Sequence, residues 1–264
     1  MIAAATFVVH LDATTPTGLP APAAQWGALV QLVALADARG ARLSLAATPQ
    51  WAAWWSAGSA CTVPPAATRW GATCDAVVRA WLAEGHSVGL HRHPYGGPRW
   101  DGYGDVLATT PGYLGTPEDA EGAVAAWLGA PVRWAASTEF GTGTTVSYTA
   151  LAGAAGSDPA SGGGYLVSAP CALEVDGAQT WQVRQRSAHV LLAPEVKTAL
   201  STWWPTPGLL GVATHPGDVD IGVLTATLDE LGAASVPVLD VVSASLAVEE
   251  YAAGSPAIAW QGCR

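Results

Sequence analysis

Residues 81–93 have the sequence Trp-Leu-Ala-Glu-Gly-His-Ser-Val-Gly-Leu-His-Arg-His. The apolar spacing that leads into this segment predicts a helix over residues 68–84, and Gly85 is a suitable residue to end it. Residues 87–91 form a short apolar run that predicts a buried strand. A helix that leads directly into a strand is the repeating unit of folds built on parallel sheets.

The same alternation continues on both sides of this segment. Further strands are predicted at residues 6–11, 42–47, 132–135, 165–167, 190–192, 209–214 and 236–239. Further helices are predicted at residues 23–39, from 116 onward, and at 144–154, 219–231 and 243–251. About seven such units, with no linker and no repeat, predict one α/β domain over residues 1–264 that forms a barrel. An open doubly wound sheet is the alternative.

The composition excludes several classes of protein. Half of the 264 residues (50%) are hydrophobic and only 12% are charged, which excludes a disordered acidic chain. The formal net charge is -10, with 11 Lys and Arg residues, so the basic surface that nucleic-acid binding needs is not expected. No apolar run reaches the roughly 18 residues of a transmembrane helix.

The cysteines and the start of the chain bear on localisation. Residues 1–10 lack the basic segment of a signal peptide and predict a first strand instead. The cysteines are Cys61, Cys74, Cys171 and Cys263, an even number that fits two disulfides and an extracellular or periplasmic location. Cys61 and Cys74 flank a Pro-containing loop and are the favoured pair. Unpaired thiols in a cytoplasmic protein are the alternative, and no CxxC motif suggests a thiolate zinc site.

Five polar residues are predicted at the ends of three strands. His10 and Asp12 lie two positions apart, as do His91 and His93, so each pair shares one face. His215 follows a third strand, and sites in parallel folds form where the strands end. Two or three histidines, a carboxylate and an open position for water make a typical divalent metal site. We therefore expect one bound divalent metal, zinc first, although each histidine could instead be structural.

Aromatic residues form the second signal, with 13 Trp against two Phe. Several fall in predicted loops on the same rim as the histidines. Such side chains suit stacking on sugars, although packing in the core is the alternative. The candidate substrate-binding residues are Trp51, Trp54, Trp100, Tyr103, Trp203 and Trp204.

Other polar residues are expected to be structural. His86 precedes a predicted strand and His189 opens one, and neither is assigned a functional role. The acids Asp101, Asp105, Asp218 and Asp220 are predicted to be solvated loop caps and not a second metal site.

The segment quoted first, with the Pro94 that follows it, resembles the second motif of polysaccharide deacetylases of the NodB-homology type, carbohydrate esterase family 4. Residues 6–12 resemble the first motif of that family, which supplies an Asp ligand and an Asp base. Residues 210–216, Leu-Gly-Val-Ala-Thr-His-Pro, resemble its last motif, and Val132-Arg-Trp lies where the family has an Arg that orients the base. Residues 42–52 and 100–103 add a similarity to uncharacterised NodB-like proteins with an HxH second motif.

The resemblance implies a distorted (β/α)7 barrel and a zinc-type hydrolase that removes acyl groups, such as acetyl, from an amino sugar or glycan. The implied metal ligands are Asp12, His91 and His93, with His10 as a further candidate. The implied catalytic residues are His215 as general acid and Arg133 as the residue that orients the base. The base is Glu139, just beyond the strand at 132–135, or Asp12 itself if His10 takes over ligation.

The chain departs from the family pattern in three places, one of which is that no Arg-Pro pair follows the strand at 132–135. Leu11 precedes Asp12 where the family has adjacent acids, and Tyr95 stands where the family has its second histidine. His93 must then take the place of that histidine. Two alternatives follow: a catalytically impaired barrel that binds carbohydrate, or another metallohydrolase of the phosphoesterase or amidohydrolase type.

Overall fold

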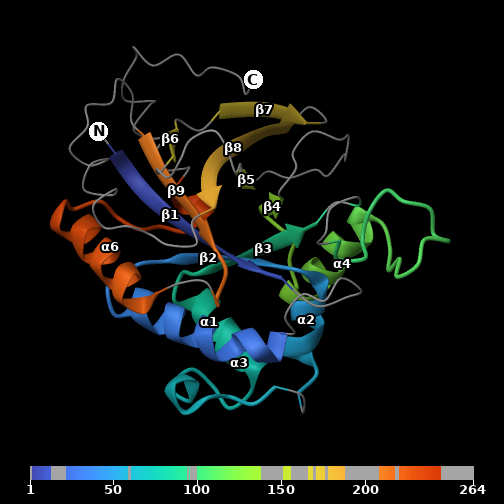
Figure 1. Cartoon of the computed structure of the whole chain (residues 1–264), viewed down its shortest axis with the longest axis horizontal. Coiled ribbons are helices and arrows are strands. Elements are labelled where there is room, and N and C mark those ends of the chain that lie inside the picture. Colours follow the sequence, from blue (N-terminus) through green and yellow to red (C-terminus); the bar gives the residue numbers. More distant parts are fainter. Residues whose placement is uncertain are drawn as a thin grey trace.

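A computed structural model of the whole chain gives its fold (Figure 1). The structure describes residues 2–12, 22–58, 61–93, 95, 100–137, 151–155, 166–168, 171–175, 178–187, 208–217 and 220–244. Its strands are β1 (Ile2–Leu11), β2 (Leu43–Ala47), β3 (Ser87–Arg92), β4 (Ala135–Ser137), β5 (Leu151–Ala155), β6 (Leu166–Ser168), β7 (Cys171–Val175), β8 (Ala178–Ser187) and β9 (Gly208–Thr214). Its helices are α1 (Pro22–Asp37), α2 (Pro49–Ser56), η1 (Pro65–Ala67), α3 (Cys74–Ala83), α4 (Pro117–Leu128) and α6 (Ile221–Ala233).

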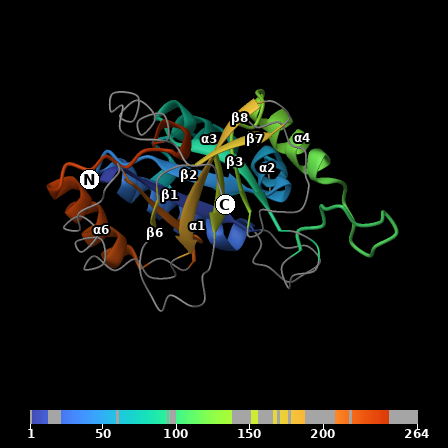
Figure 2. The same cartoon turned by 90° about the horizontal axis from the view of Figure 1, so that it is seen from above.

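The strands form one mixed sheet in the order β6-β9-β1-β2-β3-β4-β5-β8-β7. Neighbours from β9 through β8 run parallel, whereas β6 and β7 pair antiparallel with β9 and β8. The helices α1, α2 and α3 lie together on one side of the curled sheet (Figures 1 and 2). The fold is therefore mixed α/β, with a curled parallel sheet that is compatible with a partial barrel.

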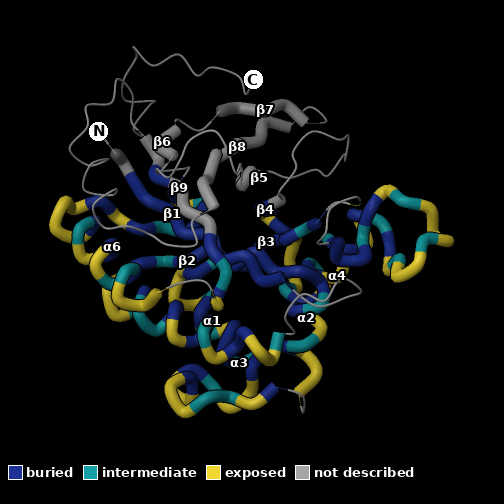
Figure 3. The backbone as a smooth tube through the Cα atoms, viewed as in Figure 1, coloured by how far each residue is buried: buried dark blue, intermediate teal, exposed yellow. Residues whose placement is uncertain are grey.

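The two faces of β1 have different roles. Phe7 and Val9 belong to the large hydrophobic core that the helices cover. Val8, on the opposite face, belongs to a smaller inner cluster, and the polar residues Thr6 and His10 on that face are also buried. Because successive side chains alternate, the chain places polar groups on the inner face while apolar groups hold the helices. The central strands are accordingly buried on both faces (Figure 3).

Trp134 fills the inner face next to the strand that carries the histidines. It is almost fully buried, and its ring lies against Gly89 of β3. A Cβ atom on Gly89 would lie 2.5 Å from the Trp134 carbonyl oxygen and would also overlap the indole ring. Glycine at this position therefore leaves room for the tryptophan on the face of β3 that also carries His91, two residues further along.

One predicted element has the wrong type. Residues 144–154 were expected to form a helix, but residues 151–155 form the strand β5, and residues 144–150 lie outside the described part of the chain. The sequence of β5, Leu-Ala-Gly-Ala-Ala, has no β-branched residue, so its local preference is helical. Pairing with β4 and β8 overrides that preference.

Other predicted elements differ in their bounds. The helix expected from residue 68 begins at Cys74, where Thr73 is the N-cap, and residues 65–67 form the separate turn η1. The strand expected at 132–135 begins at Ala135, and residues 236–239 contribute only the bridge between Val238 and Ala5. The predicted strand 190–192 lies outside the described residues, as does the predicted helix 243–251 after residue 244.

A disulfide joins Cys61 to Cys74, which confirms the favoured pairing. The bond attaches the segment before η1 to the first residue of α3, and both cysteines are buried. A disulfide fits an oxidising compartment such as the extracellular space. Cys263 and the side chain of Cys171 lie outside the described residues. None of the helices that the structure describes is long and apolar enough to cross a membrane.

Replacing both cysteines, as Cys61→Ala with Cys74→Ala, is expected to lower the free energy of unfolding by about 3 kcal/mol. The bond closes a loop with a sequence separation of 13, and a cross-link of that size restricts the unfolded chain by about this amount. Urea denaturation of the parent and the double variant measures the difference. Equal midpoints and slopes would show that the bond does not contribute to stability.

Candidate metal centre

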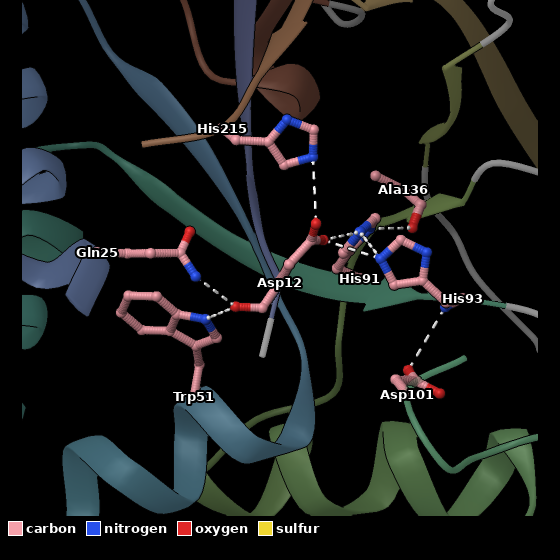
Figure 4. A network of polar contacts seen from close by, with 8 residues as sticks. All are labelled: Asp12, Gln25, Trp51, His91, His93, Asp101, Ala136 and His215. Atoms are coloured by element: carbon pink, nitrogen blue, oxygen red, sulfur yellow. Dashed lines mark hydrogen bonds and ion pairs between the residues drawn. The ribbon is translucent and has the colours of Figure 1, made fainter. Parts of the chain in front are cut away.

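The carboxyl ends of three parallel strands bring the predicted site residues together. Asp12 follows β1, His91 and His93 lie at the end of β3, and His215 follows β9. All four side chains converge on one point of the inner face (Figure 4). The prediction that these segments meet at one edge is confirmed by the contacts between their side chains.

Asp12, His91 and His93 form a compact buried triad. The Oδ1 atom of Asp12 lies 2.9 Å from Nε2 of His91 and 2.8 Å from Nε2 of His93. The two Nε2 atoms lie 3.0 Å apart. Bonds of about 2.0–2.2 Å to a shared ion place ligand atoms roughly 2.8–3.1 Å apart at right angles and roughly 3.3–3.6 Å apart at tetrahedral angles. The triad therefore has the donor atoms and approximately the spacing that a divalent metal requires.

The hydrogen bond at Nδ1 of His91 indicates which of its ring nitrogens faces Asp12 without a proton. Its Nδ1 atom lies 3.1 Å from the carbonyl oxygen of Ala136, which can only accept a hydrogen bond. In neutral His91 the ring proton is therefore on Nδ1, and Nε2 presents a lone pair to the carboxylate of Asp12. Two acceptors at this distance repel each other unless a cation lies between them. A histidine whose other nitrogen donates to a backbone carbonyl is also the usual arrangement of a metal ligand.

The protonation states of the triad suit a cation. Burial opposes ionisation of Asp12, but its contacts with His215, His91 and His93 hold its pKa well below the ordinary value. Burial, with the neighbouring His91, lowers the pKa of His93. The carboxylate is thus ionised and the His93 imidazole neutral at neutral pH, as metal ligation requires.

His10 lies beside the triad but outside it. Its ring centroid is 4.3 Å from that of His91 and 5.5 Å from that of His215. The ligand atoms within 4.8 Å of one another come from Asp12, His91 and His93. Burial, with the two neighbouring histidines, lowers the pKa of His10 well below its ordinary value. Asp12 therefore suits ligation better than His10, which packs over His91 as a neutral ring.

His215 lies on the opposite side of the Asp12 carboxylate. Its Nε2 atom is 3.3 Å from Oδ2 of Asp12, and its side chain is 15% exposed, against 0% for His91. Asp12 thus uses one oxygen toward the His91–His93 pair and the other toward His215 (Figure 4). The most accessible histidine of the cluster is therefore the one suited to contact a substrate.

The backbone of Asp12 is held by two buried side chains. The indole Nε1 of Trp51 donates to the Asp12 carbonyl oxygen at 2.6 Å, and Nε2 of Gln25 donates to the same oxygen at 2.8 Å. These bonds fix the segment that leaves β1 and orient the carboxylate. Neither contact was predicted from the sequence, because both join segments that are distant along the chain.

The tryptophans after β2 lie on a helix and not in the predicted loop. Trp51 and Trp55 are fully buried on α2 and Trp54 is half-buried, at the spacing that places one face of a helix against the core. The signal was present, because Thr48 and Pro49 are a typical helix start. Trp51 therefore packs in the core in this structure and does not line a cleft.

Two other aromatic candidates lie in the loop after β3. Trp100 is nearly buried and its Nε1 atom donates to the carbonyl oxygen of Tyr103, which is half-buried. Tyr95 meets the Trp100 ring edge-on at 5.2 Å and is 56% exposed. The loop therefore presents an accessible aromatic side chain two residues after His93, whereas the predicted Trp203 and Trp204 lie outside the described residues.

The structure does not bring Arg133 to the triad. Its side chain is exposed, whereas the neighbouring Trp134 is buried on the inner face. Among the described residues, no hydrogen bond or ion pair joins Arg133 to Asp12. Glu139 lies outside the described part of the chain. The roles predicted for these two residues stay predictions.

Asp101 is buried and not solvated, contrary to the prediction. Its side chain has no exposed surface, and burial raises its pKa to about 6 against the effect of hydrogen bonds from backbone N–H groups. Asp220, by contrast, caps α6 at the surface as predicted, and Asp105 is exposed. Asp218 lies outside the described residues.

A second group, Asp37, Glu84 and His86, also has ligand atoms within 4.8 Å of one another. Here Nδ1 of His86 accepts a hydrogen bond from the backbone N–H of Leu43 at 2.9 Å, so the ring proton is on Nε2. Neither nitrogen then offers a free lone pair. Asp37 also pairs with Arg42 at 3.0 Å, which supplies the positive charge that a metal would bring. This group is a structural cluster and not a second metal site.

His86 is expected to make the protein sensitive to acid. Burial, with nearby Arg42, lowers its pKa from 6.5 to about 4. Between these values the unfolded chain binds a proton that the folded protein does not, so stability falls as the pH falls. The loss reaches about 3 kcal/mol at pH 4 and is absent above pH 6.5.

The variant His86→Asn tests this effect, since the Asn oxygen can still accept the bond from Leu43. Urea denaturation at pH 7 and pH 4 should show a smaller acid-induced loss in the variant than in the parent. Identical losses in the two proteins would contradict the assignment.

Comparison of the chain with models of known protein families finds no match, and comparison with curated protein sequences finds none either. The similarity to deacetylases therefore stays a prediction from the motifs.

Proposed function

We propose that this protein is a metal-dependent hydrolase that removes acyl groups from an amino sugar or glycan. One observation carries the proposal: Oδ1 of the buried Asp12 lies 2.9 Å from Nε2 of His91 and 2.8 Å from Nε2 of His93, so three typical metal-ligand atoms meet at one point. The motif order along the chain supports the deacetylase class. We further propose that the sheet closes into a complete (β/α)7 barrel. The parallel pairing of β8 with β9 supports this closure.

Asp12, His91 and His93 would hold the metal ion, most simply zinc. A metal at such a site lowers the pKa of a water molecule toward about 7 and polarises the acyl oxygen. The buried position of the triad excludes bulk water from the ligand atoms. Their fixed orientation, set by the Ala136 carbonyl and by Trp51, means that little rearrangement is needed during the reaction.

His215 is the proposed general acid. Its Nε2–H faces the second oxygen of Asp12, which stabilises the protonated imidazole. The proton that passes to the departing amine or alcohol then comes from Nδ1. The water proton must go to a carboxylate; the candidate from the sequence is Glu139, and Asp12 would serve only if His10 replaced it as a metal ligand.

A catalytically impaired carbohydrate-binding barrel is the second candidate, and Leu11 is the observation that favours it. Leu11 stands where the family has an acid, and it is fully buried in the core that the helices cover. That position therefore supplies no base. In this case the metal centre would persist without turnover, and the accessible Tyr95 would contribute to sugar binding.

A substrate panel separates these possibilities. The zinc-loaded protein would be incubated with N-acetylated and O-acetylated sugar oligomers, phosphoesters and simple amides, and product release measured. Acetate release from the acetylated sugars alone supports the proposal. Turnover of phosphoesters or amides alone indicates another metallohydrolase, and sugar binding without turnover of any member indicates the binding barrel.

A further inference from the structure

Asp101 joins two segments next to the metal triad. Its Oδ2 atom accepts a hydrogen bond from the backbone N–H of His93 at 3.4 Å, and its Oδ1 atom accepts one from the N–H of Tyr103 at 3.0 Å. Figure 4 shows the carboxylate close to the main chain of His93. A buried carboxylate is costly unless it is paired, so these bonds fix where the side chain and its partners lie.

Two side chains in the first turn of α2 also donate hydrogen bonds to the main chain around the triad. Nε2 of Gln50 donates to the carbonyl oxygen of Asp101 at 2.7 Å, and the next residue, Trp51, donates to the carbonyl oxygen of Asp12 at 2.6 Å. Two adjacent residues of α2 thus hold two segments of the site: Trp51 bonds to Asp12, and Gln50 bonds to Asp101, which accepts the hydrogen bond from His93. These segments end different strands, β1 and β3.

We propose that Asp101 and Gln50 are positioning residues of the metal centre, which hold His93 at its distance from Asp12 through the chain α2–Asp101–His93. The inference rests on the proposed metal centre. The Nε2 atom of His93 must stay 2.8 Å from Oδ1 of Asp12, although its main chain lies just beyond the last residue of β3. Because β3 ends at Arg92, sheet pairing no longer fixes the main chain of His93. The hydrogen bond from its N–H to Asp101 fixes it instead.

The test measures binding of Co²⁺ to the metal-free full chain, by calorimetry and by the visible spectrum of the bound ion. Asp101→Asn keeps the size of the side chain but replaces one acceptor oxygen by an NH₂ group, which faces a backbone N–H. Loss of such an outer partner typically weakens metal binding 10–100-fold, and we expect that loss together with a changed Co²⁺ spectrum.

Asp220→Asn is the matched control. Asp220 also accepts hydrogen bonds from two backbone N–H groups, at Gly222 and Val223, but it caps α6 at the surface. Asparagine is also a good N-cap, so this replacement should leave stability, Co²⁺ affinity and spectrum close to those of the parent. A purely structural Asp101 would behave in the same way as this control.

The outcomes are distinct. Parent-like affinity and spectrum in folded Asp101→Asn would overturn the positioning role while leaving the metal centre intact. No Co²⁺ binding by the parent would instead contradict the proposed function itself. If Asp101→Asn does not fold, Gln50→Leu decides, because it removes the neutral hydrogen bond from this half-buried side chain to the Asp101 carbonyl oxygen. We expect about 2- to 10-fold weaker binding in that variant, and unchanged binding would overturn the proposal.

Discussion

The His91→Ala variant is expected to lose metal binding at this site. His91 is fully buried, and its Nε2 atom lies within 3.0 Å of both other ligand atoms. Removing it leaves one imidazole and one carboxylate, too few protein donors for a zinc site of the usual kind. The loss of affinity should exceed the roughly 10–100-fold that removal of an outer partner costs. Elemental analysis after dialysis against trace zinc measures the difference.

His86→Asn is the control for this result. His86 is also a buried histidine next to two carboxylates, but its Nδ1 atom accepts a backbone hydrogen bond and it should not bind metal. The control variant should therefore retain the metal content of the parent. Equal loss of metal in both variants would place the ion elsewhere or attribute the loss to misfolding. Full metal content in His91→Ala would exclude the triad as the site.

The His215→Gln variant is expected to keep the metal and to lose most of the hydrolytic rate. Glutamine can still donate a hydrogen bond to Oδ2 of Asp12, but it cannot transfer a proton to a leaving group. Loss of a general acid typically lowers kcat about 10²–10⁴-fold. Acetate release from an acetylated amino-sugar oligomer, measured across pH with metal content in parallel, tests this expectation.

Two results would contradict the role of His215. An unchanged kcat would show that another group protonates the leaving atom. Loss of metal along with activity would make His215 a ligand and not an acid. A leaving group that needs no protonation, such as a nitrophenol ester, serves as the internal control, because its cleavage should depend far less on His215.

The strand pattern predicted which side chains meet at the triad, but it did not predict the residues that support them. His91 and His93 share a face because a strand alternates with period two, and that rule depends only on local sequence. The carboxyl ends of parallel strands then bring Asp12 and His215 to the same place. Strand periodicity and parallel pairing are therefore enough to place these side chains together, whatever loops cover the site.

The supporting residues depend on contacts between distant segments, and the sequence alone could not place them. Asp101 appeared to be a solvated loop residue, and only the folded loop and α2 bury it. Trp51 suggested sugar stacking, yet helix formation after Thr48 turns it into the core. Strand β5 was predicted as a helix because its alanines favour a helix locally. Its hydrogen-bonded pairing with β4 and β8 makes it a strand.

The most direct test of the account is the metal stoichiometry of the parent protein. The full chain would be stripped of metal with a chelator, titrated calorimetrically with zinc at neutral pH, and checked by elemental analysis. We expect one tightly bound ion per chain at the triad of Asp12, His91 and His93, and none at the cluster around His86. Failure of the folded parent to bind zinc, or any comparable divalent metal, would contradict the metal centre and the hydrolase built on it.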